Sequence, residues 1–269
     1  MDGLFDTHCH LNLNIFEEDL TLVMERGREA GVSFFLVPGI DVATSRRAVE
    51  LAEQFPGVYA AVGIHPSEAY QWNSQVAREI SSLARHPHVV AIGEIGLDYY
   101  RDRTPRELQQ AVLREQLDLA LDVQLPVILH QRASFDDLWN MLNQWLQENR
   151  GDAPYLTDRA GVFHSFDGTA EEARKVTELG FLVGVSGPVT YKNALNRRAI
   201  VSCLDLSSIV LETDSPYLPP HPFRGKRNEP AFLRYVSEKV AEIHQINSVE
   251  IAGITTHNAA RLFALELLS

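Results

Sequence analysis

The sequence lacks long apolar runs, and it contains few cysteines. No stretch approaches the roughly 18 consecutive apolar residues that a membrane-spanning helix requires, and the first residues have no basic segment of the kind that opens a secretory signal peptide. Its two cysteines, Cys9 and Cys203, are too few for a disulfide framework. We therefore expect a cytoplasmic protein with reduced thiols and no contact with a membrane.

An excess of positive charge is also missing. The chain has 36 acidic against 24 basic residues, a formal net charge of −12. This balance argues against a protein that covers duplex DNA with a broad basic face. A phosphate substrate remains compatible with it, because a metal ion and a few local arginines can set the field inside one cleft.

Linkers, low-complexity tracts and internal repeats are absent as well, so we expect one domain over residues 1–269. Short apolar runs alternate with amphipathic stretches along the whole chain. The predicted strands are Leu4–His8, Ser33–Pro38, Val58–Ile64, Val89–Glu94, Pro126–His130, Gly161–His164, Phe181–Ser186 and Ile209–Glu212. A last helix is predicted over Thr256–Leu268, outside the barrel.

Eight strands, each followed by a helix, imply a parallel sheet, because parallel neighbours need a crossover connection. An open doubly wound sheet would explain the alternation too. The number of units and the lack of a second domain favour a closed single-domain α/β fold, the (β/α)8 TIM barrel, which typically takes about 250 residues.

Side chains that can bind metal stand where the predicted strands end. His8 and His10 are two residues apart on one strand, so they project to the same face. A buried, hydrogen-bonded histidine pair would give the same local pattern. Four further strands finish in a metal-competent residue, however, and active sites of this barrel are assembled from such ends. The complete predicted ligand set is His8, His10, Glu94, His130, His164 and Asp214.

Six donors exceed the four that one tetrahedral zinc ion takes, so two divalent ions (Mg²⁺, Mn²⁺ or Zn²⁺) are predicted. Glu94 would bridge them, and Asp214 would bind one ion and act as general base towards a metal-activated water. A single ion, with the remaining residues around its ligands, is the alternative.

Basic and aromatic residues near the same strand ends are candidates for substrate contact. His65 and Arg132 follow the third and fifth strands, and the only dense basic cluster, Arg224, Lys226 and Arg227, follows the eighth. Loops after the last strands of this fold frequently bind phosphate. Tyr99, Tyr100 and Tyr217 could stack on unpaired bases, although loop tyrosines more commonly pack on their own loop.

Taken together, these motifs resemble the TatD family of metal-dependent deoxyribonucleases, in the amidohydrolase superfamily. The resemblance runs over nearly the whole chain, through FDTHCHL at the start, GIHP at 63–66, GEIGLDYY at 93–100, LHQR at 129–132, FHSFDG at 163–168, LETDSPYLPP at 211–220, RGKRNEP at 224–230 and THNAARLF at 256–263. It implies a TIM barrel in which His8, His10 and Glu94 hold one ion. Glu94, His130 and His164 would hold the other, with Asp214 completing the centre. It also implies a hydrolase of DNA phosphodiester bonds, acting as an exonuclease on single-stranded ends.

Two other functions fit the same residues. A small-molecule amidohydrolase or lactonase could use this centre, although such enzymes usually bridge their metals with a carboxylated lysine, and no lysine precedes Lys175. A binding or scaffold protein could keep the barrel without turnover. No protein partner is implied.

Overall fold

The computed structural model describes residues 3–101 and 103–266 of the chain. Its eight strands form one sheet in chain order, and each pairs in parallel with the next. The strands are β1 (Leu4–Asp6), β2 (Val32–Pro38), β3 (Val58–Val62), β4 (Val89–Asp98), β5 (Val127–Arg132), β6 (Gly161–Phe163), β7 (Phe181–Val185) and β8 (Ile209–Leu211).

The two edges of the sheet meet where β1 and β8 end. The backbone amide of Thr7 donates to the carbonyl oxygen of Leu211 at 3.1 Å, and Cys9 forms a parallel bridge with Ser215. These contacts close the ring, so the predicted (β/α)8 barrel is confirmed.

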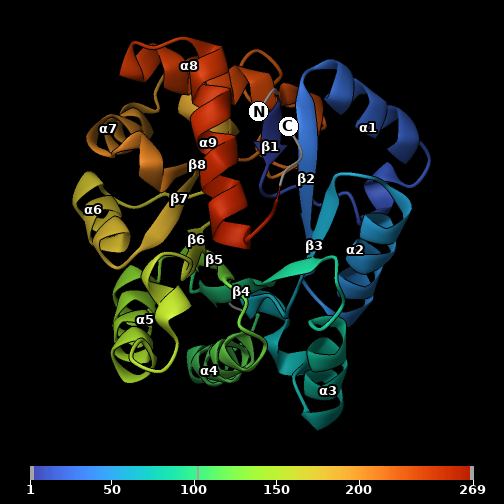
Figure 1. Cartoon of the computed structure of the whole chain (residues 1–269), viewed down its shortest axis with the longest axis vertical. Coiled ribbons are helices and arrows are strands. Elements are labelled where there is room, and N and C mark those ends of the chain that lie inside the picture. The colour runs from blue at the N-terminus through green and yellow to red at the C-terminus, as the bar shows by residue number, and fades with distance from the viewer. Residues whose placement is uncertain (1–2, 102, 267–269) are drawn as a thin grey trace.

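Helices surround the strands in chain order, as Figure 1 shows for α1 to α8. They are α1 (Leu20–Glu29), α2 (Val42–Gln54), α3 (Ser74–Leu83), α4 (Arg106–Val123), α5 (Phe135–Asn149), α6 (Ala170–Glu178), α7 (Leu195–Cys203) and α8 (Leu233–His244). Their starts carry local signals: Asp41 and Thr44 form a capping box at α2, which satisfies amides that the first turn leaves free. No helix in these described ranges is long and apolar enough to cross a membrane.

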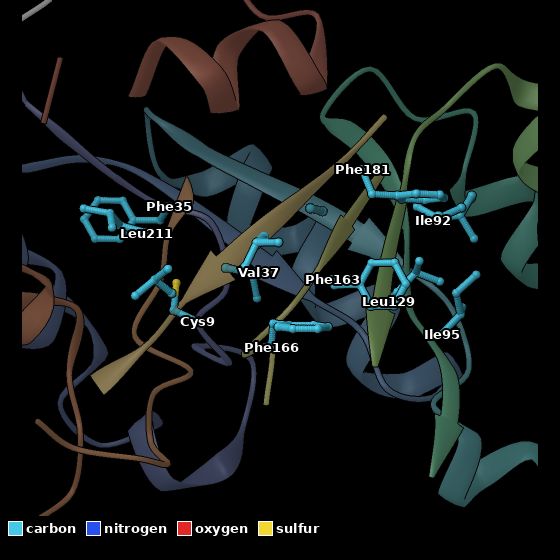
Figure 2. Close-up of a cluster of buried hydrophobic side chains, with 14 of the residues drawn as sticks. Cys9, Phe35, Val37, Ile92, Ile95, Leu129, Phe163, Phe166, Phe181 and Leu211 are labelled. Atoms are coloured by element: carbon cyan, nitrogen blue, oxygen red, sulfur yellow. The ribbon is translucent and has the colours of Figure 1, made fainter. Parts of the chain in front are cut away.

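The core has two layers because side chains alternate along each strand. On β2, Phe35 and Val37 belong to the larger cluster between sheet and helices, whereas Leu36 belongs to a smaller cluster inside the barrel. Figure 2 shows part of the larger cluster, to which Cys9, Phe35 and Leu211 belong. Burial raises the pKa of the Cys9 thiol well above its usual range, which fits a packing role for this residue.

The last helix differs from its prediction. It spans Ser248–Phe263 (α9) rather than Thr256–Leu268, and Leu268 itself lies outside the described residues. Its side chains Ala259, Leu262 and Phe263 join the inner cluster. The helix crosses the middle of the ring in Figure 1, and Thr256 donates to the carbonyl oxygen of Gly3, just before β1. α9 therefore lies outside the barrel, as predicted, and covers its amino-terminal end.

Seven predicted strands agree with the structure within two residues at each end, and β4 does not. It continues four residues beyond the predicted end at Glu94, to Asp98. The pairing register of β4 with β5 shifts between Ile92 and Ile95. This irregularity lets the polar Glu94 enter the barrel while the strand goes on, so the carboxylate did not mark the strand's end.

Candidate metal centre

The six predicted ligands come from five places on the barrel and converge at the carboxyl ends of the strands. His8 and His10 follow β1 in a segment that stays extended through the bridge at Cys9. Glu94 lies within β4 and His130 within β5, while His164 follows β6 directly and Asp214 lies beyond β8. Asp214 adopts a left-handed conformation (φ 56°) that aspartate tolerates, and its amide donates to the carbonyl oxygen of His8 at 2.8 Å.

One half of the centre is built from His8, His10, Asp214 and one oxygen of Glu94. The Nε2 atoms of the two histidines lie 3.1 Å apart. Glu94 Oε2 is 3.5 Å from Nε2 of His8 and 3.7 Å from Nε2 of His10. Asp214 Oδ1 lies 3.5 Å from Nε2 of His10. These four donor atoms are close enough together to bind one metal ion.

The other half uses the second oxygen of the same carboxylate. Glu94 Oε1 lies 2.7 Å from Nδ1 of His130 and 3.4 Å from Nε2 of His164. Glu94 thus presents one oxygen to each pair of imidazoles, with the geometry that a bridging ligand needs. Ligand atoms of His8, His10 and Glu94, and likewise of Glu94, His130 and His164, lie within 4.8 Å of one another.

Charge also suits this site to cations. Glu94, Asp98, Glu212 and Asp214 are all buried, and buried carboxylates need compensating positive charge. Burial by itself would raise the pKa of Glu94, but His164, His65 and the other neighbouring histidines hold it well below its usual range. Burial opposes protonation of His164, yet Glu212 and Glu94 raise its pKa to about 10. A proton on His164 supplies part of the positive charge that metal ions would bring, so the donor set fits divalent ions.

Two buried carboxylates stand behind the ligands of the second half. Asp98 Oδ2 lies 3.3 Å from Nε2 of His130, and Glu212 Oε1 lies 3.3 Å from Nδ1 of His164. In each case the other ring nitrogen faces Glu94. The sequence motifs alone indicate no role for Glu212 or Asp98. Side chains on a strand alternate in direction, so Glu94, Gly96 and Asp98 share a face if the strand continues to Asp98. This alternation is the sequence signal that could have identified Asp98 as a neighbour of the site.

The predicted substrate-binding residues differ in their surroundings. His65 Nε2 lies 3.6 Å from Glu94 Oε1, and burial lowers the pKa of His65 to about 3, so the ring is neutral. The amide of Ser67 donates to His65 Nδ1 at 3.1 Å, which leaves the hydrogen on Nε2, pointing into the centre. Arg132 covers the ring of Tyr100 at 3.9 Å, and Arg224 covers Tyr191 at 4.4 Å.

The three residues of the basic cluster after β8 differ in their contacts. Arg224 and Lys226 are exposed, with the Lys226 ammonium 5.7 Å from the Phe223 ring. Arg227 instead forms ion pairs with Asp19 at 2.7 Å and Glu229 at 2.9 Å. The Arg227 guanidinium is thus engaged in joining this loop to the start of α1.

A parallel (β/α)8 barrel with histidines and carboxylates converging at the carboxyl ends of its strands defines a class, the metal-dependent hydrolases of the TIM-barrel fold. The chain belongs to one family within this class, because the family model described as TatD related DNase matches residues 5–264.

Relatives agree with this assignment along their whole length. YabD of Bacillus subtilis, described as a metal-dependent hydrolase, is 42% identical over 97% of this chain and 99% of its own. A protein of Rahnella sp. described as the 3'-5' ssDNA/RNA exonuclease TatD is 37% identical over 97% of this chain and 98% of its own. The crystal structure of YjjV, a TatD homologue from Escherichia coli K12, has a TM-score of 0.89 at 35% identity and covers 97% of this chain and 98% of its own.

Proposed function

We propose that this protein is a divalent-metal-dependent exonuclease that removes nucleotides from the 3′ ends of single-stranded DNA. The observation that carries the proposal is the division of Glu94 between two imidazole pairs, at 3.5 and 3.7 Å on one oxygen and at 2.7 and 3.4 Å on the other. The polarity and the single-stranded substrate follow the description of the Rahnella relative.

The ligand assignment has two parts. His8, His10, Asp214 and Glu94 would hold one ion, and Glu94, His130 and His164 would hold the other. Two bound metal ions would supply activation of a water for attack on phosphorus and stabilisation of the attacking and leaving oxygens.

Asp214 serves as the general base. Burial acts to raise its pKa, but hydrogen bonding to His10 and the charges of His164 and His8 lower it, so the carboxylate stays ionised and can accept a proton. Its position is fixed from β1: Asp6 Oδ2 accepts a hydrogen bond from the hydroxyl of the adjacent Thr213 at 2.6 Å. A positioned base of this kind contributes about 10²- to 10⁴-fold to the rate.

Phosphate recognition falls to residues around the centre. His65 donates a hydrogen bond from Nε2 to a non-bridging phosphate oxygen. Because its ring is neutral, it adds no positive charge next to the metal ions. Arg132, Arg224 and Lys226 supply positive charge at the mouth, as a chain of net charge −12 requires for a phosphate substrate. Arg227 holds the loop that carries Arg224 and Lys226 through its ion pairs with Asp19 and Glu229.

A cytoplasmic location is part of the proposal. Both cysteines are free, Cys9 buried and Cys203 partly buried, which fits a reducing compartment.

The experiment is a nuclease assay on metal-stripped protein and on protein loaded with Mg²⁺, Mn²⁺ or Zn²⁺. The substrates are single-stranded DNA labelled at its 5′ end, the matching RNA and a lactone panel. We expect metal-dependent shortening of the DNA in single-nucleotide steps, lost in Asp214→Asn and kept in Asp122→Asn, a matched change on the exposed face of α4. Hydrolysis of a lactone with the DNA left intact would favour the small-molecule hydrolase. No hydrolysis of DNA, RNA or lactones would favour a scaffold protein.

A further inference from the structure

Several exposed apolar side chains lie on the side of the barrel where the strands end. Eight large hydrophobic side chains are exposed in the part of the chain that the structure describes. Five of them lie in segments that follow a strand's carboxyl end: Ile15, Tyr70, Tyr100, Leu195 and Tyr217. Single exposed apolar residues need no explanation, so the surroundings of each aromatic ring decide which of them could contact a ligand.

The three loop tyrosines differ in what covers their rings. The Tyr99 hydroxyl donates to Asp137 at 2.8 Å, and Arg106 lies over its ring at 4.3 Å, so Tyr99 packs on its own surroundings. Tyr100 is 69% exposed but has Arg132 over its ring. Tyr217 is 53% exposed, and its ring meets the His10 ring edge to face, with centroids 5.9 Å apart.

The backbone under Tyr217 is held firmly. Its amide donates to the carbonyl oxygen of Asp214 at 2.8 Å. The amide group of Asn228, which is fully buried, donates to the carbonyl oxygens of Thr213 at 2.8 Å and Tyr217 at 2.6 Å. The loop therefore presents a half-exposed aromatic ring at a fixed position against a predicted metal ligand.

We propose that Tyr217 is the stacking platform for the base of the nucleotide being removed, and that it makes the enzyme select single strands. The inference rests on the proposed function, because it places the reacting phosphate at the metal centre beside His10. Aromatic rings stack on any base, so this contact gives no sequence preference. In a duplex the terminal base is held in place by pairing with its partner and by stacking on its one neighbour, whereas the terminal base of a single strand can turn onto the ring.

Equilibrium binding tests this contact without turnover. The probe is a fluorescent single-stranded oligonucleotide whose last phosphodiester linkage carries a methylene group in place of the leaving oxygen, so that it binds without being cut. A second probe is identical but lacks the terminal base. Binding of both to Mg²⁺-loaded protein is followed by anisotropy for wild type, Tyr217→Ala, Tyr217→Phe and Tyr70→Ala, a matched loss of an exposed ring in another loop.

We expect Tyr217→Ala to weaken binding of the complete probe at least about fivefold, the lower end of what one stacked base contributes. Tyr217→Phe keeps the ring and should bind as wild type does. On the probe without the terminal base, wild type and Tyr217→Ala should bind alike. Tyr70→Ala should affect both probes equally.

Two results would overturn the inference. One is an equal loss on both probes in Tyr217→Ala, and the other is no loss on the complete probe. Shortening of ordinary DNA measured in parallel separates the two proposals: if shortening occurs without the Tyr217 effect, only the stacking role fails. If wild type neither binds the probes nor shortens DNA, both proposals fail.

Discussion

Replacing Asp98 by asparagine should weaken the binding of one metal ion and leave the other nearly unchanged. Asp98 is 1% exposed, and its Oδ1 accepts hydrogen bonds from the amides of Tyr100 and Arg101, both at 3.0 Å. Its Oδ2 therefore stays fixed 3.3 Å from His130 Nε2. A carboxylate at this distance favours a hydrogen on Nε2, which leaves Nδ1 of His130 to bind metal.

Asparagine keeps the shape and the Oδ1 acceptor, but it sets an NH₂ group against the N–H of His130 and removes the negative charge. Loss of such a supporting contact typically lowers metal affinity 10- to 100-fold, about 1.4 to 2.7 kcal/mol. Titration of metal-stripped protein with Zn²⁺ in competition with a chromophoric chelator should resolve two steps. Only the step that belongs to Glu94, His130 and His164 should move.

Asp122→Asn is the matched control, since the same change on the exposed face of α4 leaves the centre intact. The reasoning is refuted if Asp98→Asn binds both ions as wild type does while keeping the wild-type circular dichroism spectrum. Equal weakening of both steps would also refute it, because the contact would then act on the whole centre and not through His130.

Three further outcomes follow from the same contacts. Chelation should lower the thermal midpoint by about 5 to 10 °C, because ions present at 100 times their Kd stabilise a fold by about 2.7 kcal/mol; calorimetry with and without chelator checks this. Arg224→Met should raise KM for single-stranded DNA, whereas Arg227→Met should instead cost about 1 kcal/mol in urea unfolding. In wild type, hydrogen bonding to Arg227 lowers the pKa of Asp19. The resulting stabilisation is present above the pKa of Asp19 in the unfolded chain and is lost as the pH falls. The difference in unfolding free energy between Arg227→Met and wild type should therefore shrink below about pH 4. Phe263→Ala should lower stability by about 3 kcal/mol without changing metal affinity, because Phe263 packs on Phe5 at the far end of the barrel.

Much of the fold could be predicted because each strand carries its own signal. An apolar run that ends in a histidine or an acid is visible without knowing its neighbours. The parallel order then brings all such ends to one side, since every crossover returns the chain in the same direction. This is why residues as distant in sequence as His8 and Asp214 could be assigned to one centre.

Features that depend on a distant partner could not be predicted in this way. Arg227 resembled a phosphate ligand, but its partner Asp19 lies 208 positions earlier in the chain. α9 has an ordinary amphipathic pattern, and only contacts with distant segments, such as that of Thr256 with Gly3 before β1, place it across the barrel. β4 passed beyond its predicted end because the irregularity at Gly93 and Glu94 depends on the register with β5.

The tyrosines show the same limit at the level of function. Tyr99 and Tyr100 are adjacent, and Tyr217 is equivalent to them by every local criterion: an aromatic residue in a loop after a strand. They differ in the residues that contact them. Tyr99 contacts an aspartate and an arginine, Tyr100 contacts an arginine, and Tyr217 contacts the ring of His10. Base stacking needs an open ring face near the reacting phosphate. Only Tyr217 combines a half-exposed ring with contact to a predicted metal ligand, so the structure, rather than the motif, selects the residue to mutate.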